Sequence, residues 1–181
     1  MTRQNPRIFD STNNFSARQQ QGGGTNRRQR DGICAALSSL WCFHMLDGVR
    51  DLLSKPSNPR AQALQVGYRW DPAGGGADDV NLLFRIGLNA SKVFDSKKIV
   101  KALKVMEATA GTYYFGYPAH RLAAQIGPGG YYFYDCDENG AGGLFLYDNV
   151  NDWKNKIQDS GYSATALGSD DSWTGFKVTK R

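Results

Sequence analysis

The stretch ICAALSSLWCFHMLDGVRDLLSK, residues 33–55, predicts one long helix near the start of the folded part of the chain. Ile33, Leu37 and Leu40 recur at helical spacing, and Asp31 is suited to cap the helix N-terminus. The first half of this helix is apolar on nearly every side. That pattern is typical of a helix buried in a core rather than one lying on a surface.

Residues 1–30 precede the helix and are rich in Gln, Asn, Ser, Gly and Arg, with almost no aliphatic side chains. This composition predicts a disordered arm, and an uncleaved secretion signal of a bacterial effector is the second interpretation. The first 31 residues hold six arginines and two aspartates, and the whole chain has a net charge of +5. The predicted domain, residues 31–181, is therefore almost neutral. Because a nucleic-acid-binding domain usually has a basic face, we expect no nucleic-acid partner.

Beyond this helix the sequence predicts more helices and then strands. Residues 78–88 and 95–109 have the spacing of amphipathic helices, and Asp95 or Ser96 would cap the second. Segments with strand-like alternation and many aromatic residues follow, with one short helix among them: strands at 112–117, 119–126, 131–135 and 143–147, a helix at 149–161, and closing strands at 162–167 and 173–179. This order predicts the α+β class, with a helical part packed on an antiparallel sheet.

The number and spacing of the cysteines and histidines argue against a disulfide framework and against a metal site. Cys34, Cys42 and Cys136 are too few for a disulfide framework, which suits synthesis in a reducing cytosol. His44 and His120 have no metal-ligand spacing to each other or to a cysteine pair, so we expect no metal or other cofactor.

The distribution of apolar residues bears on membrane insertion and on secretion. No apolar run approaches the roughly 20 residues that a membrane span needs, so we expect no integral membrane segment. The N-terminus also lacks the apolar core of a cleaved secretory signal. If the protein leaves its cell, we expect a route without a cleaved signal peptide.

Cys34 is the candidate nucleophile, because it lies in the first turn of the predicted helix. Unsatisfied backbone N–H groups and the helix dipole favour a thiolate there, and the thiolate is the reactive form. A cysteine nucleophile also needs a base. His44 lies ten residues along the same helix, about 15 Å away at 1.5 Å per residue. His120, on a predicted strand, is therefore the candidate base.

An acid that orients His120 is expected on the next strand. If Ile126 faces Tyr131 across the hairpin, strand alternation places His120, Asp135 and Asp137 on one face. Asp135 is then a diagonal neighbour of His120, with roughly 7–8 Å between the Cα atoms, and a two-residue slip would place it directly opposite. We prefer Asp135 and keep Asp137 as the alternative.

Two further groups complete the candidate site. The backbone N–H of Cys34 and the side-chain amide of Gln29 are suited to bind an oxyanion. Cys42 and Cys136 are interpreted as core residues, which is the usual environment of a free cysteine. The combination of Cys34, a later histidine and an acid points to acyl transfer through a thioester.

Two segments resemble a known family. DGICAALSSLW, residues 31–41, and YPAHRLAAQIGPGGYYFYDCDENGAGGLFLYDNVNDW, residues 117–153, are similar to the YopT-type cysteine proteases, bacterial effectors that include AvrPphB. In that family a cysteine opens a helix, a histidine opens a strand, and aromatic residues precede an aspartate.

The resemblance implies a papain-like cysteine protease fold, with Cys34, His120 and Asp135 at the three catalytic positions and Gln29 matching an upstream amide. The family usually has Asp-Pro-Asn where this chain has Asp135-Cys136-Asp137. The resemblance also implies an effector or toxin, made in a bacterial cytoplasm, that cleaves a protein of a host or target cell.

Peptide-bond hydrolysis is the preferred activity, and two alternatives stay open. A glutamine or asparagine deamidase, or a transglutaminase-like toxin, would use the same triad and the same acyl-enzyme. A binding module with a retired site is the alternative from another class, because a fold alone does not determine function.

Overall fold

The structure is a computed structural model that describes residues 7–9, 34–48, 64, 77–117, 120–136, 143–160 and 172–181. In these residues seven strands form one sheet in the order β1-β6-β5-β4-β3-β7-β2, and all neighbouring strands are antiparallel. The strands are β1 (Arg7–Phe9), β2 (Leu88–Lys97), β3 (Gly111–Tyr117), β4 (His120–Gly127), β5 (Gly130–Asp135), β6 (Gly143–Tyr147) and β7 (Trp173–Lys180). The helices are α2 (Cys34–Leu46), α4 (Ala77–Arg85), α5 (Ile99–Glu107) and α6 (Val150–Ser160). The α+β class and the antiparallel sheet are as predicted.

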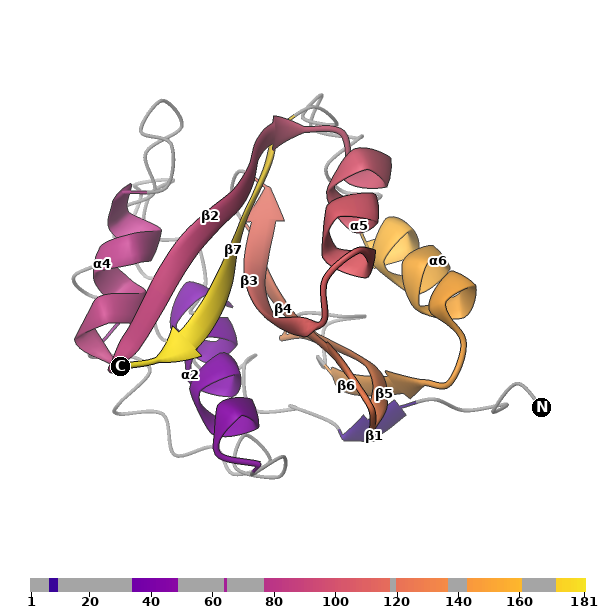
Figure 1. The fold of residues 1–181 in the computed structure, drawn as a ribbon, viewed down its shortest axis with the longest axis horizontal. Coiled ribbons are helices and arrows are strands. Elements are labelled where there is room, and N and C mark those ends of the chain that lie inside the picture. Colours follow the sequence, from indigo (N-terminus) through magenta and orange to yellow (C-terminus); the bar gives the residue numbers. More distant parts are fainter. Residues whose placement is uncertain are drawn as a thin grey trace, which may run out of the picture.

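Helices cover both faces of the sheet, with α2 and α4 on one side and α5 and α6 on the other (Figure 1). Because successive side chains of a strand point to opposite faces, β3 contributes to two cores. Tyr114 packs in the core under α2, whereas Tyr113 and Phe115 pack in the core under α5 and α6. The expected single helical part is therefore two helical layers, which explains why β3 is buried at every residue from 112 to 117.

Helix α2 is buried along most of its length, as its sequence predicts. It is shorter than predicted, because it ends at Leu46 instead of continuing to residue 55. Gly48 has a φ of 74°, and its N–H bonds to the carbonyl of Met45. A glycine in this left-handed conformation commonly terminates a helix. Residues 49–55 and the expected cap Asp31 lie outside the described residues.

The strand at 88–97 was not predicted, because residue 88 and residues 95–97 were assigned to helices and residues 89–94 to no element. This segment forms the edge strand β2, and the following helix begins at Ile99 rather than at residue 95. Lys98 is the N-cap of that helix and makes no side-chain capping bond. Asp95 instead accepts hydrogen bonds from Thr174, at 2.8 Å, and Lys92, at 3.0 Å. Pairing with β7 has overridden the local capping signal.

The hairpin that carries the candidate site has the predicted register, because Ile126 pairs with Tyr131. The arm departs from expectation at one point: Arg7–Phe9 form strand β1, which pairs with β6. The rest of the arm and the expected strand 162–167 lie outside the described residues. None of the helices in the described ranges has the length and hydropathy of a membrane span.

Candidate active site

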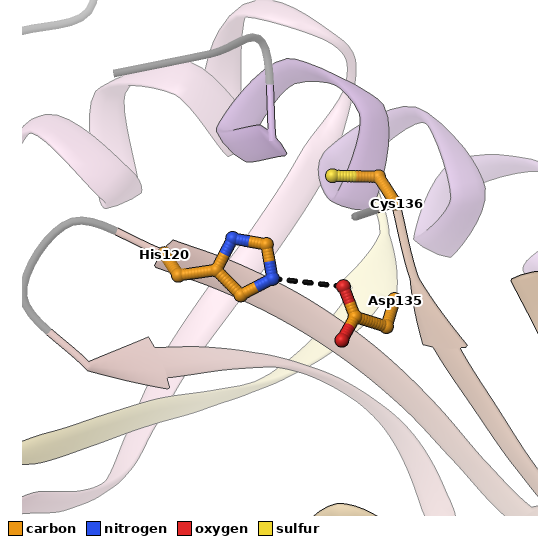
Figure 2. Close-up of side chains that lie close together, drawn as sticks. All are labelled: His120, Asp135 and Cys136. Atoms are coloured by element: carbon orange, nitrogen blue, oxygen red, sulfur yellow. Dashed lines mark hydrogen bonds and ion pairs between the residues drawn. The ribbon is translucent and has the colours of Figure 1, made fainter. Parts of the chain in front are cut away.

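Three chain segments meet at one end of the sheet. Cys34 is the first described residue of α2, His120 opens β4, and Asp135 ends β5. Since β4 and β5 are antiparallel, the start of one lies beside the end of the other. The Nε2 atom of His120 lies 2.8 Å from Oδ1 of Asp135, and Figure 2 shows the imidazole directed at that carboxylate. The diagonal pairing expected from the sequence therefore brings these two side chains into contact.

His120 bridges the thiol and the carboxylate through its two ring nitrogens. A carboxylate only accepts hydrogen bonds, so Nε2 carries the proton that faces Asp135. The thiol of Cys34 makes a side-chain hydrogen bond with His120, and Nδ1 is the ring nitrogen left for it. The side chains of His120 and Asp135 are only 12% and 5% exposed, which protects their interaction from solvent screening.

The surroundings of the pair favour a thiolate at Cys34. Burial raises the pKa of this half-buried thiol, but the hydrogen bond and the charge of His120 lower it. The backbone N–H and the charge of Arg121 lower it further, and the net effect is a pKa below the ordinary value. Cys34 therefore has the electrostatic character of a nucleophilic cysteine.

The same pair favours a protonated imidazole. Burial lowers the pKa of His120, but the charge of Asp135, the hydrogen bond with it and the interaction with Cys34 raise it, to about 10. A lowered thiol pKa and a raised imidazole pKa both favour the form of the pair in which a thiolate lies beside an imidazolium.

A buried ion pair holds the backbone on which His120 is placed. Nε and Nη2 of Arg121 donate to the two carboxylate oxygens of Asp79, both at 2.9 Å. Nη1 donates to the carbonyl of Tyr117 at 2.6 Å and to that of His120 at 3.2 Å. The hydroxyl of Tyr114 also donates to Asp79, at 2.8 Å. This cluster ties α4, β3 and β4 together next to the imidazole.

Helix α2 is held by hydrogen bonds to the backbone of Arg121, the same residue that pairs with Asp79. Ser38 lies one turn after Cys34, and its hydroxyl donates to the carbonyl of Arg121 at 2.9 Å. The backbone of Arg121 thus contacts α2 twice, through its N–H at Cys34 and its carbonyl at Ser38. These contacts set the distance between the thiol and the imidazole.

Of the residues predicted from the sequence, Cys34, His120 and Asp135 lie together. Gln29 and the alternative acid Asp137 are outside the described residues. Cys136 is buried, as expected of a core residue, and it also adjoins the His120–Asp135 pair.

Sequence reasoning missed the ion pair between Asp79 and Arg121. The signals available were an acid inside a predicted amphipathic helix and an arginine directly after the candidate base.

Comparison with known proteins gave a match in structure alone. No protein-family model and no curated protein sequence matches the chain. The crystal structure of the Pseudomonas avirulence protein AvrPphB aligns with 89% of this chain and 98% of its own, with a TM-score of 0.52 and 12% identity. The fold is similar to that of AvrPphB. This likeness concerns the path of the chain.

Proposed function

We propose that this protein is a papain-like cysteine protease with Cys34 as nucleophile, His120 as acid and base, and Asp135 as the residue that orients His120. The observation that supports the proposal most is the linked series of thiol, imidazole and carboxylate. The lowered thiol pKa and the raised imidazole pKa are what this chemistry requires.

In the proposed reaction the Cys34 thiolate attacks a peptide carbonyl carbon, and the carbonyl oxygen takes the negative charge. The backbone N–H of Cys34 and the amide of Gln29 are the proposed donors to that oxyanion. The intermediate collapses as the C–N bond breaks, and His120 gives its Nδ1 proton to the leaving amine. His120 then takes a proton from water, which hydrolyses the thioester and releases the acid and Cys34. No cofactor takes part.

Two independent observations favour an effector protease. The motifs around Cys34 and His120 resemble the YopT-type family, and the structural comparison found AvrPphB, a protein that this family includes. We therefore extend the proposal to a protein substrate in a host or target cell. The proposed route is synthesis in a bacterial cytoplasm followed by secretion or translocation without a cleaved signal peptide.

The test compares new protein termini in host cells that express the wild type or Cys34→Ala. We expect termini that appear only with the wild type and that are also absent with His120→Ala. Identical termini in the three samples would contradict proteolysis. A target that changes from an amide to an acid, with no new terminus, would identify a deamidase instead.

A further inference from the structure

Cys136 places a second thiol beside the candidate catalytic pair. One ligand atom from each of His120, Asp135 and Cys136 lies within 4.8 Å of the other two. Figure 2 shows the Cys136 side chain extending over the His120–Asp135 pair on the side of the helix. Cys136 directly follows Asp135, the last residue of β5, and the way the chain leaves that strand brings its thiol to the pair. Among the described residues this is the group of three with metal-ligand chemistry.

The three donors are of the types that Zn²⁺ binds. Zn²⁺ takes thiolate, imidazole and carboxylate ligands, at about 2.3 Å for sulfur and about 2.0–2.2 Å for nitrogen and oxygen. Mg²⁺ and Ca²⁺ prefer oxygen ligands and do not favour a thiolate. A tetrahedron with these bond lengths has ligand atoms roughly 3.3–3.8 Å apart. To reach that geometry the sulfur would move inward by up to about 1 Å, and the imidazole and carboxylate, which lie 2.8 Å apart, would separate by about 0.5 Å. Water would occupy the fourth position.

We propose that His120, Asp135 and Cys136 form a regulatory Zn²⁺ site. Binding replaces the Nε2–H proton of His120 and the S–H proton of Cys136 by the metal, and both protons pass to solvent. The metal then lies between His120 and Asp135 in place of their hydrogen bond.

An imidazole bound to Zn²⁺ is not available for proton transfer with Cys34. If the proposed function is right, Zn²⁺ inhibits the enzyme, and this consequence rests on that proposal. The YopT-type proteases that this chain resembles usually have proline at this position, whereas this chain has Cys136. Such a site would keep the protease inactive in a compartment where zinc is bound and would restore its activity in a compartment where zinc is released.

The metal site is tested without the nucleophile, so that failure of the protease proposal does not affect the result. Full-length Cys34→Ala is titrated with Co²⁺ under a non-chelating reductant, and then Zn²⁺ is added. We expect the charge-transfer band of a Co²⁺–thiolate bond, the visible bands of tetrahedral Co²⁺, and loss of both when Zn²⁺ displaces Co²⁺ at one equivalent.

Cys136→Ser in the same background should lose the charge-transfer band and bind Zn²⁺ more than about tenfold more weakly. Asp135→Asn should also weaken binding, and circular dichroism checks that each variant is folded. Cys42→Ser is the matched control, because Cys42 is equally buried but donates to the carbonyl of Tyr113 at 3.5 Å. Its band should be unchanged. A band that survives Cys136→Ser, or no band in Cys34→Ala, overturns the site.

Inhibition is measured separately on the wild type. We expect Zn²⁺ to lower the rate of substrate cleavage, and a chelator to restore it. If Co²⁺ binds through Cys136 and the protein cleaves its substrate at the same rate with and without Zn²⁺, the regulatory role is overturned while the protease proposal stands.

Discussion

At the scale of single residues, the reactivity of Cys34 comes from its partners rather than from its type. Cys42 is also a buried thiol on the same helix, yet burial raises its pKa well above the ordinary value, and a hydrogen bond offsets this only in part. At Cys34 the charge and hydrogen bond of His120 reverse the effect of burial. One helix thus carries an activated thiol and an inert one.

This contrast predicts the pH dependence of alkylation. Since the pKa of Cys34 is lowered, its thiolate persists as the pH falls below the ordinary thiol range, so iodoacetamide should label Cys34 at pH about 6 much faster than free cysteine. Mass spectrometry of the labelled peptides measures this, with the peptide of Cys42 as internal control. Cys42 should stay unlabelled. A rate at Cys34 equal to that of free cysteine would support a retired site.

Asp135 is predicted to control the alkaline limb of activity. Its charge helps to raise the pKa of His120 from 6.5 to about 10, so the imidazolium persists until the pH passes through that value. In Asp135→Asn this support is absent, and the imidazolium should lose its proton at lower pH. We expect kcat/KM to fall by at least about tenfold and its alkaline limb to move to lower pH.

The profile of kcat/KM against pH is the measurement. Asp148→Asn is the control, because Asp148 follows β6 at the end of the β5–β6 pair remote from Asp135. An unshifted limb would show that Asp135 does not act through His120.

The three candidate catalytic residues could be predicted because local rules place them. Strand alternation and the turn at residues 127–130 set the register between His120 and Asp135. The ion pair of Asp79 and Arg121 could not be predicted in this way, because its partners are 42 residues apart and meet only when α4 packs against β2 and α2. The position of Cys136 could be predicted, but its closeness to the imidazole depends on how the chain leaves β5.

At the scale of elements, the buried Arg121–Asp79 pair connects α4 to the strand that begins with His120. Removing one member of a buried ion pair leaves an uncompensated charge, so Arg121→Met should lower the free energy of unfolding by about 3–5 kcal/mol. Arg121→Met with Asp79→Asn should cost less than Arg121→Met alone, because no buried charge remains and the asparagine still accepts from Tyr114.

Urea denaturation of the wild type, the two single variants and the double variant measures this coupling. The rate of Cys34 alkylation in the folded double variant tests the positioning role, and we expect it to fall because Arg121 no longer holds the backbone at His120. Additive losses of stability would show that Asp79 and Arg121 are not coupled. An unchanged alkylation rate would show that the pair does not position His120 for Cys34.

Strands rich in aromatic residues could be predicted, and the edge of the sheet could not. Strands β3 and β5 are runs of aromatic residues that are buried on both faces, and both lie inside the sheet. Strand β2 lies at an edge, is largely exposed, and pairs with β7 with two irregularities. An edge strand contributes few apolar side chains, so its local sequence predicts structure poorly.

At the scale of the whole molecule, one sheet separates two cores, and the candidate nucleophile packs with only one of them. Cys34 and Cys136 pack with the core under α2, whereas α5 and α6 close the opposite face. The order of helices and strands predicts the α+β class. It does not predict which helix covers which face, because that depends on long-range packing of a sheet that is apolar on both sides.

This division predicts that equal losses of stability have unequal effects on the site. Leu37, on α2, and Leu103, on α5, are both 1% exposed, so Leu37→Ala and Leu103→Ala should each cost about 2–5 kcal/mol. Both should unfold in a single transition, since both cores share the sheet. Only Leu37→Ala should slow the alkylation of Cys34 under conditions in which the protein is folded, because Leu37 holds the helix that carries the thiol. Urea denaturation and alkylation rates measure the two effects, and equal slowing by Leu103→Ala would mean that the sheet transmits the change between its faces.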